Sequence, residues 1–362
     1  MRSYIFHSIL LTALFAVVLT SVCALLCPNI LHMMSTPEDI FSGAYSYPLI
    51  IFLGIPFTLL YNLEAAMLRV VGDSKTPFVF LAISTVTNIA LDLLCILTFR
   101  WGVAGAAIAT ITAQALSGIL CFFFIRKRQK ILHISAEDCT FDRNCCLSAL
   151  AMGAPMGLQF SITAIGSMVM QAANNGLGSV YVSGFTAGAR LKQFTLCPFD
   201  ALATAVCTFC GQNLGAKRFD RIRQGIRVGV VVALVYGIGI GLVLIFGGRV
   251  LSMLFMSSSQ VAVLDASAKY LRYMGCMYWM LGLLNVFRLA IQGLGYSGRA
   301  VFAGVIEMVA RTAVSLIFVP IYDYTAICCA DQVAWTTAVL YLIPMCLYLL
   351  KKVEREAERL CA

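Results

Sequence analysis

Ten long apolar stretches are the feature that most limits what this chain can fold into. Each approaches the roughly 20 residues that an α-helix needs to cross a ~30 Å hydrocarbon layer. They occupy residues 5–26, 47–70, 78–98, 105–125, 147–171, 179–208, 226–247, 268–293, 300–320 and 333–350. Because 60% of the residues are hydrophobic and only 12% are charged, too little polar surface remains for a water-soluble domain. We therefore predict an all-α polytopic membrane protein with about ten transmembrane helices.

The formal net charge of +9 is concentrated in short bursts of Lys and Arg at 126–130, 217–227 and 351–359. These bursts occupy alternate loops, as basic residues do in the cytoplasmic loops of membrane proteins. The intervening loops are expected to hold the acidic residues Glu38, Asp39, Asp265, Asp323 and Asp331. This pattern places both termini in the cytoplasm and excludes nucleic acid as a partner.

No motif for an enzyme, a cofactor or a structural metal site stands out. The 15 cysteines are scattered mostly singly through apolar stretches, without the spacing of a zinc site. Gly293, Gly295 and Gly298 satisfy G-x-G-x-x-G, but they follow an apolar helix rather than a strand. Gly237 and Gly241 form G-x-x-x-G, a pattern that permits close helix packing but is common by chance. We predict that the protein is not an enzyme and uses no cofactor.

The two halves of the chain resemble each other weakly. When YNLEAAMLRVVGDS (61–74) is aligned with LNVFRLAIQGLGYS (284–297), Gly72 falls on Gly295 and the surrounding apolar stretches also correspond. Repeated halves are typical of transporters, whose binding sites lie between or within the repeats.

The repeat predicts two lobes of unequal size. The stretches at 147–171 and 179–208 have no counterpart in the first half, so the first lobe is expected to be two helices short. The predicted parts are an N-terminal lobe of four helices at 1–125, a cytoplasmic linker at 126–146, a C-terminal lobe of six helices at 147–350 and a charged cytoplasmic tail at 351–362.

Four segments resemble the multidrug and toxic compound extrusion (MATE) family, prokaryotic branch. They are LRVVGDSKTPFVFLAISTVTNIALD, WGVAGAAIATITAQ, GAPMGLQF and GQNLGAKRFDR. The resemblance runs over essentially all 362 residues and matches the third to twelfth helices of the family's twelve-helix pattern. It implies a location in a bacterial plasma membrane. It also implies antiport, in which organic cations leave as Na⁺ or H⁺ enters and two lobes rock against each other.

Asp92 is an acidic residue in the middle of an otherwise apolar span, where a charge costs about 3 kcal/mol on permissive scales. Asn88 lies four residues earlier on the same helical face, and Thr110 lies at a similar depth in the next span. Their oxygens suit Na⁺, a hard cation, or a proton relay.

The family's prokaryotic branch has Asn, Asp and Thr at this spacing, so the resemblance implies that Asn88, Asp92 and Thr110 couple transport to the ion. In that branch an Asp of the first helix completes the site, and the matched helices do not include it. The alternative is a polar cluster that only holds the lobe together.

The span at 179–208 is the most polar. Polar residues recur there at steps of three and four: Thr186, Arg190, Gln193, Cys197, Asp200 and Thr204. Such a stripe is expected to face a substrate cavity, with Thr186, Arg190, Gln193 and Asp200 as its lining. The alternative is that Arg190 and Asp200 pair with neighbouring loops.

Glu307 and Arg311 are four residues apart and are expected to neutralise each other on one helix. They are also secondary candidates for ion coupling. Glu64 lies near the inner end of its span, where we expect it to reach water.

These features together predict a secondary active efflux transporter. Its partners would be small organic cations and membrane lipids, and we expect a monomer. Two alternatives stay open. One is a lipid-linked saccharide flippase of related fold, which would need a larger and more basic lumen. The other is an inactive truncated remnant.

Overall fold

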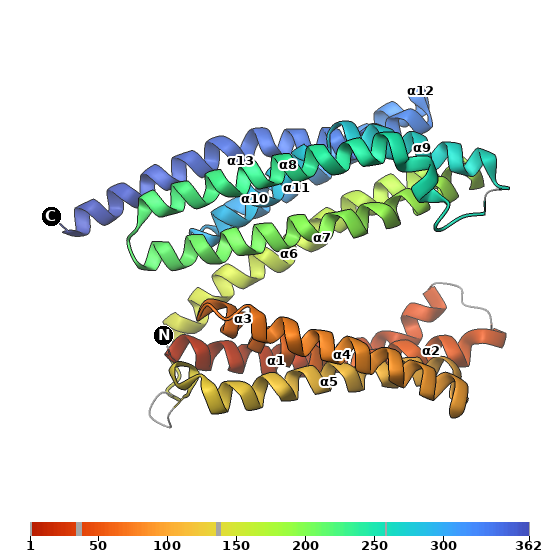
Figure 1. Ribbon diagram of the computed structural model, residues 1–362. Coiled ribbons are helices and arrows are strands. Elements are labelled where there is room, and N and C mark those ends of the chain that lie inside the picture. The colour runs from red at the N-terminus through yellow and green to blue at the C-terminus, as the bar shows by residue number, and fades with distance from the viewer. Residues whose placement is uncertain (1, 34–37, 135–138, 258, 362) are drawn as a thin grey trace. The chain divides into compact units, whose positions relative to one another are not determined.

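The computed structural model describes residues 2–33, 38–134, 139–257 and 259–361 (Figure 1). Within these residues every regular element is a helix and no strand occurs. The elements are α1 (Arg2–Met33), α2 (Glu38–Leu53), α3 (Ile55–Val70), α4 (Lys75–Leu93), the π-helical η1 (Leu94–Thr98), α5 (Gly102–Arg128), the 3₁₀-helical η2 (Lys130–Leu132), α6 (Arg143–Asn175), α7 (Ser179–Gly215), α8 (Phe219–Ser252), α9 (Val261–Cys276), α10 (Tyr278–Gly293), α11 (Ser297–Ala313), the π-helical η4 (Val314–Phe318), α12 (Val319–Tyr322) and α13 (Tyr324–Cys361).

Among the described residues, 8 helices are long and apolar enough to cross a membrane. Two further spans arise if each bent helix pair is counted as one, giving up to 10. These pairs are α2 with α3 and α9 with α10. The predicted all-α, multi-pass fold with about ten spans is confirmed.

The chain forms two compact units, Met1–Ala149 and Leu150–Ala362, which we call the first and second unit. Helices α1 to α5 build the first unit, and α7 to α13 belong to the second. Helix α6 begins in the first unit and continues into the second.

Equivalent helices of the two units are bent at equivalent places. Gly54 separates α2 from α3 at a bend of 42°, and Met277 separates α9 from α10 at a bend of 54°. Gly54 and Met277 are related by the same alignment that places Gly72 on Gly295. The weak sequence repeat therefore corresponds to a repeated structural design.

Helices α3 and α10 also end in the same way. Gly72 and Gly295 adopt φ values of +89° and +90°, which favour glycine because a Cβ atom would crowd the backbone. The next residue in each unit donates its N–H back across the turn, from Asp73 to the Leu68 carbonyl at 2.9 Å and from Tyr296 to the Ile291 carbonyl at 3.2 Å. This is the Schellman arrangement of a helix C-terminus.

Helix α7 contains the stretch at 179–208, which has no counterpart in the first half of the sequence. In the second unit it packs against α8, α9 and α10. Close packing in this unit depends on the G-x-x-x-G pair of α8. A Cβ at Gly237 would lie 2.6 Å from Trp279 Cα, and one at Gly241 would overlap the carbonyl oxygen of Gly275. The G-x-x-x-G pattern is common by chance, but in this protein both of its glycines lie against the backbone of a neighbouring helix.

We expect Gly241→Ala to lower the free energy of unfolding by about 1–3 kcal/mol, because overpacking against backbone forces the helices apart. Gly239→Ala on the same helix is the matched control, since a Cβ there has no neighbour within 4 Å. The control should be neutral or slightly stabilising, as alanine favours helix. Thermal unfolding of the purified variants in detergent measures both effects, and equal melting temperatures would contradict the packing account.

Candidate ion-coupling and cavity residues

Helices α4 and α5 carry the three predicted coupling residues. The two helices pack against each other, and the Ser84 hydroxyl of α4 donates to the Ala113 carbonyl of α5 at 2.5 Å. Asn88 is one turn further along α4, and Thr110 is about one turn back along α5. Because α4 and α5 run antiparallel, one turn forward on α4 and one turn back on α5 move in the same direction along the helix pair. Asn88 and Thr110 therefore lie at the same depth.

Asn88 and Asp92 are half-buried, and each has a buried polar atom without a partner. Neither Asn88 Nδ2 nor Asp92 Oδ1 forms a hydrogen bond within the part of the chain that the structure describes. The Thr110 hydroxyl donates to the Ala106 carbonyl at 2.9 Å, which leaves its lone pairs able to accept. A buried polar atom without a partner costs about 1–3 kcal/mol, and a cation or proton bound at Asp92 Oδ1 would relieve this cost for the carboxylate.

The backbone beside Asp92 is irregular. Helix α4 ends at Leu93, the residue after Asp92, and passes into the π-helical η1 at Leu94. The second unit repeats the feature where α11 passes into η4 at Val314. Such π segments are often found at functional sites. The structure thus brings the predicted residues onto adjoining helices without joining them by a direct hydrogen bond among described atoms.

The polar stripe of α7 lies on one exposed face of that helix. All six of its members are exposed: Thr186, Arg190, Gln193, Cys197, Asp200 and Thr204. The apolar residues Phe185, Leu191 and Phe199 are buried. Among the described residues, the side chains of Arg190 and Asp200 take part in no ion pair. Within the described part of the chain the stripe is exposed, and no ion pair of Arg190 or Asp200 with a loop is observed.

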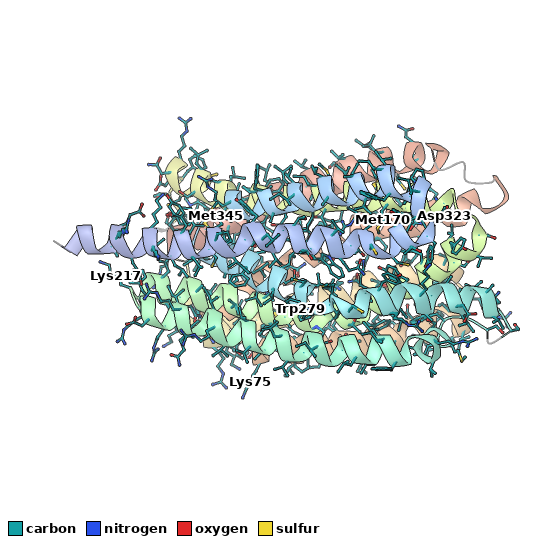
Figure 2. All side chains as sticks on the ribbon, turned by 90° about the horizontal axis from the view of Figure 1, so that it is seen from above. Lys75, Met170, Lys217, Trp279, Asp323 and Met345 are labelled. Carbon is teal, nitrogen blue, oxygen red and sulfur yellow. The ribbon has the colours of Figure 1, made fainter. Side chains whose placement is uncertain are left out.

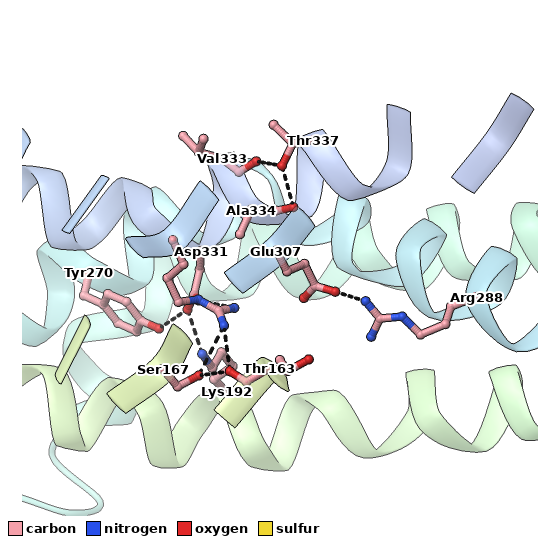
Figure 3. A network of polar contacts seen from close by, with 11 residues as sticks. Thr163, Ser167, Lys192, Tyr270, Arg288, Glu307, Asp331, Val333, Ala334 and Thr337 are labelled. Atoms are coloured by element: carbon pink, nitrogen blue, oxygen red, sulfur yellow. Dashed lines mark hydrogen bonds and ion pairs between the residues drawn. The ribbon is translucent and has the colours of Figure 1, made fainter. Parts of the chain in front are cut away.

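A buried ion network lies in the second unit (Figure 3). Asp331 of α13 accepts from Lys192 of α7 at 2.7 Å and from Arg311 of α11 at 2.9 and 3.0 Å. The Tyr270 hydroxyl of α9 adds a hydrogen bond of 3.1 Å. Arg311 also donates to the Ser167 hydroxyl of α6 at 3.2 Å. The carboxylate thereby connects α13 directly with α7, α9 and α11, and Arg311 extends the network to α6.

The expected pairing of Glu307 with Arg311 is wrong. Glu307 instead forms an ion pair with Arg288 of α10 (Figure 3), and Arg311 pairs with Asp331. Both residues of α11 are buried, with 2% and 4% of their surface exposed. A buried charge needs a counter-charge close by, and neighbouring helices supply one to each residue, Arg288 to Glu307 and Asp331 to Arg311.

The placement of Asp331 in an outer loop is also wrong. Helix α13 begins earlier than the predicted span, at Tyr324, and encloses Asp331 with 1% of its surface exposed. The sequence analysis missed Lys192 and Arg288 as well. Their charge within apolar spans was the available signal, because an ionisable residue in a membrane segment requires a partner.

Comparison with known proteins identifies the family. The MatE family model matches residues 1–94 and 155–317. Probable multidrug resistance protein YoeA of Bacillus subtilis (strain 168) is 30% identical over 250 residues, which cover 67% of this chain and 54% of the relative. Probable multidrug resistance protein YpnP of the same bacterium is 35% identical over 193 residues, which cover 53% and 43%. The chain spans about half the length of these two curated relatives.

Solved structures show the same fold. A MATE protein in complex with MaL6 and an outward-facing multidrug resistance MATE family transporter of the MOP superfamily each match with a TM-score of 0.92 at 17% identity. Each match covers 98% of this chain, and 80% and 79% of the respective solved chains. Since the family model matches more than half of the chain and the fold agrees, this protein belongs to the MATE family of membrane transporters and is not an enzyme.

Proposed function

We propose that this chain is part of a secondary active efflux transporter that exports organic cations in exchange for Na⁺ or H⁺. The observation that carries the proposal is the buried carboxylate oxygen of Asp92, which has no hydrogen-bond partner among the described residues. An acid in a membrane span is retained against its cost where it binds an ion or moves a proton. The names of the two Bacillus relatives, both probable multidrug resistance proteins, agree with drug efflux.

The coupling step follows from charge. Na⁺ or H⁺ bound at Asp92 neutralises the carboxylate, with the Asn88 and Thr110 side-chain oxygens as further ligands for Na⁺. Ion binding then favours one conformation of the transporter, and ion release favours the other. The exposed stripe of α7, with the acidic Asp200, supplies the surface that receives the organic cation during this cycle.

Transport driven by an imposed gradient tests this function. Vesicles that contain the chain should export ethidium without ATP when an inward Na⁺ or H⁺ gradient is applied. An ionophore that dissipates the effective gradient should stop the export. Export that proceeds unchanged without either gradient would contradict secondary active transport.

We further infer that the chain acts as a monomer in a bacterial plasma membrane, with both termini in the cytoplasm. In the second unit, Lys217 and Asp323 lie at opposite ends (Figure 2), and Arg223 pairs with Glu354 near the C-terminus. The basic loop and the charged tail therefore share one end of this unit. The basic residues favour the cytoplasmic side for that end.

Reporter fusions test the orientation. Fusions after Arg128, Arg223 and Lys352 should report the cytoplasm, and fusions near Asp265 and Asp323 should report the outside. Reports that place Arg223 and Lys352 on opposite sides would contradict the proposed topology, as would a consistent inversion.

A further inference from the structure

A cavity of about 550 Å³ lies in the second unit, where α11 begins beside α6 and α13. One wall is formed by residues 295–299, which are the turn after α10 and the first residues of α11. Ala151 of α6, Phe302 of α11 and Tyr341 of α13 complete the lining. The wall therefore contains the N-terminus of a helix, an end that attracts anions because its first N–H groups have no partner within the helix.

Several polar groups at the start of α11 have no partner. No side chain caps this helix, and the N–H groups of Ser297 and Gly298 donate to no acceptor in the described part of the chain. The Ser297 hydroxyl is also without a hydrogen-bond partner, although only 2% of the surface of this residue is exposed. Because a buried polar group without a partner is costly, an acceptor bound in the cavity would stabilise this helix end.

The first unit supplies an anion of its own at the equivalent place. There, at the start of α4, the Asp73 carboxylate accepts from the Thr76 N–H at 3.0 Å and from the Thr76 hydroxyl at 2.7 Å. The alignment that places Gly72 on Gly295 also places Asp73 on Tyr296, which has no carboxylate. The second unit therefore has the same helix start without the acidic group that satisfies it in the first.

Positive charge lies beside this helix start. Arg299, in the first turn of α11, lines the cavity, is exposed and takes part in no ion pair among the described residues. The Lys352 ammonium lies 5.3 Å from the centre of the Tyr296 ring, which also lines the cavity. Lys352 pairs only with the half-exposed Glu356, at 3.7 Å. A guanidinium beside free N–H groups is a combination that suits a phosphate.

We propose that this cavity binds the phosphate group of a phosphate ester, with the N–H groups of Ser297 and Gly298 and the Arg299 guanidinium as donors. The rings of Phe302 and Tyr341, with centroids 5.7 Å apart, provide an apolar wall for the organic part of the ester. A phospholipid of the surrounding membrane has both parts, and a water-soluble phosphate ester has the same phosphate chemistry. The site is independent of ion coupling and of export, because its lining belongs to the second unit and the coupling residues belong to the first.

Calorimetric titration of the purified full chain in an uncharged, phosphate-free detergent tests the site. The probes are dioctanoyl phosphatidate, dioctanoylglycerol, which lacks the phosphate, and glycerol 3-phosphate, which lacks the acyl chains. Phosphatidate should bind, and dioctanoylglycerol should bind at least about tenfold more weakly. Binding of phosphatidate alone assigns the site to a lipid, and equal binding of glycerol 3-phosphate assigns it to a soluble ester. Both results support a phosphate site, and binding of neither ester would overturn it.

Two substitutions of lining residues locate the phosphate. Arg299→Gln should weaken binding of the ester about tenfold, since it removes a charge-assisted donor. Ser297→Ala should weaken it about threefold without lowering the melting temperature, because the hydroxyl bonds to no group of the protein. Arg227→Gln is the matched control, since Arg227 is an exposed base of the same unit on α8, which does not line the cavity. An equal loss in Arg299→Gln and Arg227→Gln would overturn the proposal, because it would indicate general attraction to a basic surface.

Tyr296→Asp makes the second unit resemble the first, since it places a carboxylate where the first unit has Asp73. The new acid should occupy the start of α11, abolish binding of the ester and leave the melting temperature unchanged or higher. Such a result separates loss of the site from loss of the fold. Binding of the ester at the strength of the parent in both Tyr296→Asp and Arg299→Gln would overturn the proposal.

Discussion

Asp331→Ala is expected to lower the free energy of unfolding by about 3–5 kcal/mol, because it leaves the buried Arg311 and the partly buried Lys192 without their counter-charge. Lys192 and Arg311 both depend on this carboxylate, and the Tyr270 hydroxyl loses its acceptor. A loss of this size is a large part of the stability of most folded proteins. Thermal unfolding in detergent measures this loss of stability, and the loss of the monodisperse peak in size-exclusion chromatography serves as its readout.

Asp265→Asn is the matched control for this prediction. Asp265 pairs with Arg249 at 3.4 Å, but both side chains are more than half exposed. Exposed pairs contribute about 0–1 kcal/mol, so the control should unfold close to the parent. A double variant, Arg311→Leu with Asp331→Leu, should lose less than the sum of the two single changes, because it removes a charge together with its partner. Additive losses would mean that the network does not act as a unit.

Asp92→Asn has the largest expected effect on activity. The change keeps size and hydrogen bonding but removes the charge that Na⁺ or H⁺ neutralises. Ion-driven export should be lost, while the affinity for the organic cation should change little. Asn88→Ala and Thr110→Ala should reduce coupling by smaller amounts, since each removes one neutral oxygen ligand. Binding of ethidium to the purified variants, measured beside export from vesicles, separates the two effects.

The spans and the repeat could be predicted because their causes are local. A stretch of apolar residues of bilayer length is helical in a membrane whatever its partners are. Gly72 and Gly295 mark helix ends because the required φ is a property of one residue. The bends at Gly54 and Met277 were not predicted, since glycine and methionine share no signal for a bend, although the repeat alignment relates the two positions.

The ion network could not be predicted because its pairs are set by tertiary packing. Nothing near Asp331 in the sequence points to Lys192, which lies on a helix that packs beside it only after folding. The i, i+4 spacing of Glu307 and Arg311 suggested a local pair, yet each residue found a partner on a different helix. Glu64 was expected to reach water, but only 5% of its surface is exposed. It was misjudged for a related reason, since depth along a span does not reveal what covers the side chain.

Export under a defined gradient tests the central claim most directly. Vesicles with the parent chain, Asp92→Asn or the control Asp73→Asn are loaded with ethidium and given an imposed Na⁺ or H⁺ gradient. Asp73 lies in the turn before α4 and accepts hydrogen bonds from Thr76 at 2.7 and 3.0 Å. The parent and Asp73→Asn should export under at least one gradient, and Asp92→Asn under neither. Export by Asp92→Asn at the rate of the parent under the same gradient would contradict the proposed coupling site.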